Sequence, residues 1–203
     1  MRIRLVACVG LAVLLLGVSF ARSDSPLTST NLYQAYLDVR AVAKARTAGG
    51  MNEEIAAYLR DEKVTLDLKA AVINALGWDF HGRHNAAQFS QLAFHQPLGE
   101  LKLDQLDAAA LFCLGYLQAL DDYFQPEKAL PYLDQAAAKK PKSHTIAVIR
   151  ALVRAQTGIN DQSAWGRLGR ETIAVLDDAT LTEDPLRPAA VKIIRDYLAL
   201  YAN

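Results

Sequence analysis

The chain has 203 residues, 52% of them hydrophobic, and its 22 basic and 22 acidic side chains cancel to a formal charge of zero. This composition excludes an intrinsically disordered chain, which would be poor in apolar residues, and it fits one globular domain. The balanced charge, scattered along the chain without long blocks of one sign, also argues against a nucleic-acid-binding protein.

The first 21 residues have the pattern of an export signal. A basic start with Arg2 and Arg4 leads into the apolar run 5–18, and residues 19–21 read Ser-Phe-Ala, the small-x-small pattern of a signal-peptidase site. We therefore predict a signal peptide, 1–21, cleaved after its last residue. The mature chain, 22–203, is then expected in a bacterial periplasm or outside the cell, without membrane insertion. An N-terminal anchor that is not cleaved is the alternative.

From residue 27 onward the apolar spacing predicts helices joined by short loops, and no convincing alternating strand. Caps at the starts, and glycines and prolines at the ends, set their limits. The helices are expected at about 31–48, 53–59, 65–81, 85–95, 104–121, 126–140, 143–155, 163–178 and 185–201. The sequence therefore predicts an all-α protein.

One stretch of the chain recurs. LKAAVINALGWDF, residues 68–80, returns 38 residues later as LDAAALFCLGYLQ, residues 106–118, and a fainter third copy follows at the same spacing. Both clear copies contain Leu-Gly followed by an aromatic residue. A fixed period of this kind indicates stacked supersecondary units that bury their apolar sides against one another. The units are expected over about 65–97, 103–141 and, in degenerate form, 143–178.

These units resemble tetratricopeptide repeats, a superfamily of helix–turn–helix hairpins. The first helix of that repeat carries a bulky residue, then Leu-Gly, then an aromatic residue. The residues that fit are Ile73, Leu76, Gly77 and Phe80 in the first unit, and Leu111, Leu114 and Gly115 in the second. Those that fit the second helix are Ala129, Leu133, Ala136 and Pro141. The resemblance implies a stack of antiparallel helical hairpins, wound as a right-handed solenoid, with a C-terminal capping helix.

The small residues of the repeat are expected to serve packing. In the repeat pattern Gly77 and Gly115 lie where the paired helices approach most closely, so a side chain there would push the helices apart. Cys113 is the only cysteine beyond residue 21, which excludes an intramolecular disulfide. Its counterpart one period earlier is Ala75, which indicates a small buried contact. A reactive thiol is the alternative.

Function is expected on the concave face of such a stack, which the first helices line. The 38-residue period places side chains from successive units in columns on that face. Aromatic rings beside guanidinium groups suit a groove that binds a peptide and its carboxylate. The predicted partner-binding residues, column by column, are Asn74, Phe112 and Arg150; Trp78, Tyr116 and Arg154; and His81. Alternatively, the second column's two rings pack between repeats and the arginines are solvated.

No catalytic or metal-binding motif is recognised. His81 and His84 could be drawn as metal ligands, but a predicted turn at Gly82 separates them, so neither a metal nor a cofactor is expected. We predict a non-enzymatic interaction or assembly module of the bacterial cell envelope, which binds a peptide or a partner helix. The alternative is a periplasmic small-molecule or metal-binding accessory protein, with its cleft near Trp78, His81 and Tyr116.

Overall fold

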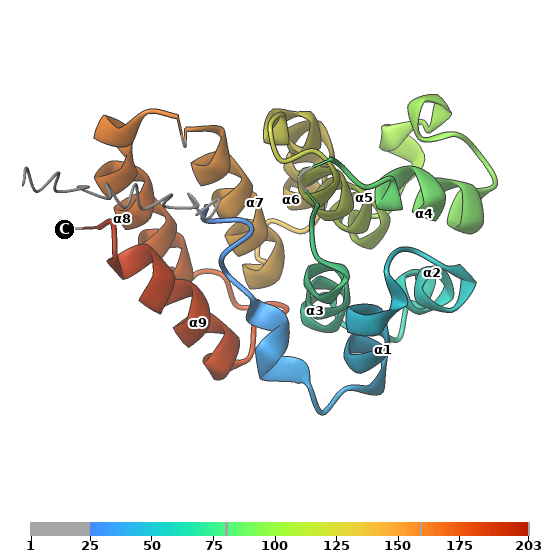
Figure 1. Ribbon diagram of the computed structural model, residues 1–203, viewed down its shortest axis with the longest axis horizontal. Helices are drawn as coiled ribbons and strands as arrows, with labels where there is room; N and C mark the ends of the chain where they lie inside the picture. The colour runs from blue at the N-terminus through green and yellow to red at the C-terminus, as the bar shows by residue number, and fades with distance from the viewer. Residues whose placement is uncertain (1–24, 80, 159, 203) are drawn as a thin grey trace, which may run out of the picture.

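No β-strand occurs in the part of the chain that the computed structural model describes, residues 25–79, 81–158 and 160–202 (Figure 1). Its α-helices are α1 (Arg40–Ala48), α2 (Glu53–Arg60), α3 (Leu66–Leu76), α4 (Asn85–Phe94), α5 (Ala108–Asp121), α6 (Leu130–Lys139), α7 (His144–Thr157), α8 (Trp165–Leu176) and α9 (Pro188–Ala199). Its 3-10 helices are η1 (Leu32–Tyr36), η2 (Leu98–Glu100), η3 (Leu103–Gln105), η4 (Pro126–Ala129) and η5 (Gln162–Ala164). The predicted all-α class is confirmed for these residues, none of whose helices is long and apolar enough to cross a membrane. The predicted signal peptide lies outside them.

Side-chain caps set several helix starts. Asn52, Asp107 and Ser143 each accept a hydrogen bond from a first-turn N–H of α2, α5 and α7, at 3.0, 2.7 and 3.4 Å respectively. These bonds satisfy donors that a helix leaves without a partner. The long helices predicted over 31–48 and 104–121 are each divided, into η1 with α1 and into η3 with α5. The predicted helical regions are therefore largely present, in shorter pieces.

The helix predicted over 65–81 ends at Leu76. The next residue, Gly77, has φ 73° and ψ −170°, a conformation that favours glycine strongly, and its N–H donates to the carbonyl of Asn74 at 3.1 Å. A Cβ added to Gly77 would meet no atom of the described residues within 4 Å. Gly77 therefore ends the helix, and the prediction that it lies at a close helix–helix contact is wrong.

Helices α3 and α4 do not form the hairpin predicted over about 65–97. α3 packs against α1, η1 and α5, whereas α4 packs against α5 and α2, and contact between α3 and α4 is at most marginal. The start of α4 is held by the end of α5, because the Asp121 carboxylate accepts the N–H of Ala86 at 2.7 Å. The two helices of the first predicted unit therefore pack against other elements and not against each other.

The second predicted unit has the expected pairing. α5 packs on α6 and α7 packs on α8, as predicted over about 103–141 and 143–178. A Cβ added to Gly115 would lie 2.8 Å from Cγ of Leu133 and 3.0 Å from Cβ of Tyr132, closer than real Cβ contacts. The prediction that Gly115 allows the paired helices to approach closely is confirmed. Cys113 is fully buried, and burial raises its pKa to about 12, as expected of a packed thiol.

The first and last helical segments meet, because α9 packs against η1 (Figure 1). The backbone N–H of Arg187 donates to the Tyr36 hydroxyl at 2.9 Å, and its guanidinium lies 4.5 Å from the centre of that ring. The same guanidinium donates to the carbonyl of Ala35 at 3.0 Å and pairs with Asp38 at 2.6 Å. In a solenoid each unit contacts only its neighbours. The described residues therefore form a closed arrangement, and not the open solenoid that the repeat implied.

Candidate functional site

Three of the seven predicted partner-binding residues lie in the core. Phe112 and Tyr116 are fully buried, and Asn74 is 6% exposed. Because a partner on the surface cannot reach these side chains, the prediction that they line a groove is wrong for all three. The alternative, in which the Tyr116 ring packs inside the molecule, is the one that the structure shows.

Asn74 connects three parts of the core by hydrogen bonds. Its amide nitrogen donates to the Tyr116 hydroxyl on α5 at 3.0 Å and to the carbonyl of Thr30 at 3.3 Å. Its amide oxygen accepts the backbone N–H of Tyr33 in η1 at 3.0 Å. Burial raises the pKa of Tyr116 strongly, so this hydroxyl stays neutral. A buried polar group needs such partners, and Asn74 supplies them to η1 and α5 together.

Trp78 and His81 lie in the loop after α3 and share no helix face with Tyr116. The Trp78 ring stacks on Tyr123, with centroids 5.1 Å apart and an angle of 26° between the planes. His81 is exposed and borders a recess of about 350 Å³ beside Arg83 and the end of α5. Within the described residues no group of three or more His, Cys, Asp or Glu side chains could hold a metal ion.

Arg150 and Arg154 are brought together on one face of α7. Both approach the same carboxylate on α6, since Asp134 Oδ1 lies 3.4 Å from Nε of Arg150 and 2.8 Å from a terminal nitrogen of Arg154. Burial, with the charge of Arg154 as a further cause, lowers the pKa of the Arg150 guanidinium, whereas Asp134 opposes this shift. Two cations thus share one anion.

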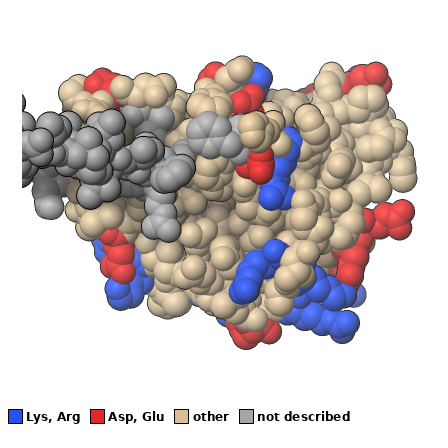
Figure 2. Space-filling model, in the orientation of Figure 1, with Lys and Arg blue, Asp and Glu red and all other residues tan. Residues whose placement is uncertain are grey.

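These two arginines border a groove of about 410 Å³, which we call the α7 groove. It runs between α7 and α8 and reaches from Lys140 to Leu181. On the face drawn in Figure 2, acidic and basic side chains lie mainly near the edges, and most of the middle is uncharged. Of the acidic residues of the groove, Glu171 pairs with Arg167 at 2.9 Å, whereas Asp178 accepts at 2.6 Å from the hydroxyl of Thr180, which carries no charge. The excess of positive charge is therefore local to Arg150 and Arg154, which share one carboxylate.

Sequence reasoning missed Lys69, a lysine of α3 that is 2% exposed. It borders a second cleft, of about 270 Å³, together with Asp107, its counterpart one 38-residue period later. A signal was present in the sequence, because Lys69 is the one cation in the otherwise largely apolar run 66–76. Helical periodicity alone gave no reason to place that cation inside.

Of the predicted residues, only Arg150 and Arg154 occur together beside a groove. Comparison with protein-family models, with curated proteins and with solved structures found no match.

Proposed function

We propose that this protein is a non-enzymatic binding module, which recognises an acidic segment of another protein in the α7 groove. One observation carries the proposal: two guanidinium groups, on Arg150 and Arg154, share the single carboxylate of Asp134. A second carboxylate supplied by a partner would complete the charge balance. Arginine favours this role because its planar fork can donate two parallel hydrogen bonds to a carboxylate.

The rest of the α7 groove suits the chain around such a carboxylate. Ala147 and Ala151 face it from α7, and Leu168 and Val175 face it from α8. Small residues on one wall and aliphatic residues on the other leave room for an apolar side chain next to the acidic one. The proposed occupant is therefore a segment with a carboxylate beside an apolar residue, in an extended or helical form.

A binding role is favoured over catalysis by the chemistry of the two cations. An arginine remains protonated at physiological pH, so Arg150 and Arg154 can hold a carboxylate but cannot act as a general base. The sequence also offers no nucleophile motif. We place the module in the bacterial cell envelope, after removal of residues 1–21. N-terminal sequencing of the exported protein should begin at Arg22, and a start at Met1 would contradict this placement.

The proposal retains the tetratricopeptide-like hairpin for only part of the chain. α5 with α6 and α7 with α8 are the two pairs that would form a short stack, and α9 would cap it. The α7 groove then lies on the second pair. The alternative, a small-molecule or metal-binding protein with its cleft near Trp78, His81 and Tyr116, is less favoured because the tyrosine is fully buried.

The test replaces both arginines, as Arg150→Glu with Arg154→Glu, and measures binding of synthetic peptides with Asp or Glu beside Leu. We expect fluorescence polarisation to show wild-type binding that weakens by about 10- to 100-fold in the double variant, since charged hydrogen bonds are removed and repulsion is added. Peptides with Asn or Gln in place of the acid should bind weakly to both proteins.

A matched control is Arg40→Glu with Arg46→Glu, which makes the same change of charge at exposed positions of α1. This control should bind as the wild type does. Equal binding by the groove variant and the wild type would refute the proposal, as would failure of every acidic peptide to bind the wild type. Circular dichroism of each variant checks that it is folded.

A further inference from the structure

The second cleft lies at the junction of several loops and helix starts. It is bordered by the loop before α3, the first turns of α3 and α5, and two residues from the C-terminal half, Lys140 and Asp184. Its volume is about 270 Å³, enough for a small organic molecule. We call it the Lys69 cleft after the side chain that distinguishes it.

Lys69 is a buried cation without a partner of its own. The residue is 2% exposed, yet no hydrogen bond or ion pair found among the described residues involves its ammonium group. Burial of a charge is costly unless an opposite charge or hydrogen bonds compensate it. Because Lys69 borders the cleft together with Asp107, solvent or a ligand in the cleft can compensate its charge.

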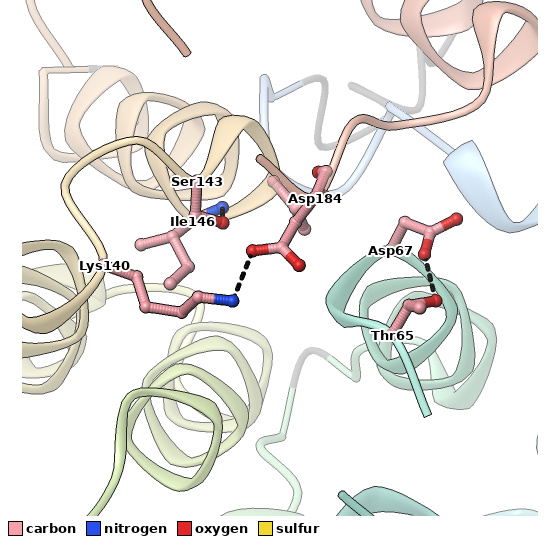
Figure 3. A network of polar contacts seen from close by, with 7 residues as sticks. Thr65, Asp67, Lys140, Ser143, Ile146 and Asp184 are labelled. Carbon is pink, nitrogen blue, oxygen red and sulfur yellow. Dashed lines mark hydrogen bonds and ion pairs between the residues drawn. The ribbon is translucent and has the colours of Figure 1, made fainter. Parts of the chain in front are cut away.

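Two of the three acidic residues that border the cleft have other partners, and the third, Glu62, is exposed. Asp107 caps α5 by accepting the N–H of Ala110 at 2.7 Å. Asp184 pairs with Lys140 at 2.8 Å, as Figure 3 shows, and both residues border the cleft. The carbonyl of Asp184 accepts the hydroxyl of Thr145 at 2.6 Å, which holds this acidic residue in place at φ 48°.

The start of α3 adds backbone N–H donors that no side chain caps. Thr65 stands at the N-cap position, but its side chain does not cap the helix. Its hydroxyl donates instead to the carboxylate of Asp67, and Figure 3 shows these two opposite Lys140 and Asp184. The first-turn N–H groups of α3 therefore lack their usual side-chain acceptor, and a helix N-terminus favours an anion.

Helix geometry brings the ammonium group and these donors to the same end of α3. Side chains on an α-helix point back toward its N-terminus, so Lys69 extends over the turn that contains Thr65 and Leu66. All three residues border the cleft. Leu59, Leu66 and Ala109 supply the apolar part of its lining.

We propose that the Lys69 cleft binds a small organic anion. The carboxylate or phosphate group of this ligand pairs with the Lys69 ammonium and accepts hydrogen bonds from the first turn of α3. Its apolar body lies against Leu59, Leu66 and Ala109. The cleft shares only Lys140 with the α7 groove, and the variants that test the two sites change different residues. Either proposal can therefore fail without the other.

The test uses two probes that differ in their anionic group, inorganic phosphate and butyrate. Isothermal titration calorimetry at low ionic strength should show that at least one of them binds the full chain with a dissociation constant of about 1 mM or below. The probe that binds identifies the chemistry of the natural ligand. If neither probe binds, the proposal is refuted.

Lys69→Met removes the charge and keeps most of the side-chain volume. We expect the affinity for the active probe to fall by about tenfold or more, because a charge-assisted contact is lost. Lys192→Met, on exposed α9, is the matched control and should bind as the wild type does. Equal affinity in Lys69→Met and the wild type overturns the proposal.

A second variant keeps the test decisive if Lys69→Met does not fold. Ala109→Leu leaves the ammonium in place but fills the cleft beside it, at a position that is only half-buried. It should also bind the active probe at least about tenfold more weakly, because the occupant is displaced. Unchanged binding by Ala109→Leu would place the probe elsewhere and refute the assignment.

Discussion

Two identical dipeptides in this protein have different structural roles. Leu76-Gly77 and Leu114-Gly115 occupy the same place in the 38-residue repeat, and an aromatic residue follows each. The first glycine ends α3 in a conformation that requires glycine. The second lies inside α5, where it allows α6 to approach. One is present for its backbone freedom, and the other for its missing side chain.

The difference arises from what packs against each copy. α5 has its partner α6 directly over Gly115, whereas α3 packs against α1, η1 and α5 and leaves the surroundings of Gly77 open. A repeated motif thus specifies a helix–helix contact only where the second helix is present. The same dipeptide without that helix becomes a terminator, and the residues after it form a loop.

Gly115→Val should produce the largest effect. Its side chain would enter space that Leu133 and Tyr132 already fill, so we expect a loss of about 3 kcal/mol in the free energy of unfolding. Urea denaturation followed by circular dichroism measures it. Gly115→Ala should lose less stability in a Leu133→Ala background than in the wild type, because the shorter side chain leaves room. Equal losses in the two backgrounds would contradict the contact.

Gly77→Ala should be less costly, because no atom obstructs the new methyl group. The backbone conformation is the only obstacle, and it should cost about 2 kcal/mol in the free energy of unfolding. Gly99→Ala is the matched control, since Gly99 has neither a positive φ nor a neighbour within 4 Å among the described residues. If both variants unfold at the same urea concentration, Gly77 is not needed for its conformation.

Asp121→Asn should produce the smallest effect, visible as a change in pH dependence. Burial raises the pKa of Asp121 above 3.8, although the hydrogen bond from Ala86 opposes this shift. The folded chain therefore retains a proton that the unfolded chain releases first. Stability should fall as pH rises from about 4 through the raised pKa, and level off above it.

Asn has no such titration and can still accept the N–H of Ala86. Urea unfolding between about pH 4 and pH 7 should therefore show a shallower decline for Asp121→Asn than for the wild type. The result tests the hydrogen bond between Asp121 and Ala86, which attaches α4 to α5. Identical pH profiles would show that this carboxyl titrates normally.

The fold was predictable wherever local chemistry decides it. Asn52 and Ser143 cap α2 and α7, which begin close to the predicted starts at 53 and 143, and Gly115 has the role that the repeat indicated. The end of α3 was not predictable in this way, because apolar residues continue to Phe80 and Leu76-Gly77 fits the middle of a repeat helix. Whether a glycine lies within a helix or ends it depends on a partner far along the chain.

The site was predictable only in its α7 part. Arg150 and Arg154 are four residues apart on one helix, so local geometry brings them to one face. Phe112 and Tyr116 were misplaced because helices on several sides of α5, among them α3, α4 and α6, bury nearly all of its side chains. Lys69 was missed for the same reason, since its burial depends on segments far from it in sequence.

The contact between Arg187 and Tyr36 has a consequence for the dynamics of the chain. In an open repeat array the terminal units can fray independently, since each is held only from one side. Here the hydrogen bond joins residues 151 positions apart, so opening either end breaks the same contact. The amide hydrogens of η1 and α9 should therefore exchange with deuterium as one cooperative unit. During folding, neither end is protected from exchange until the chain has closed this long loop.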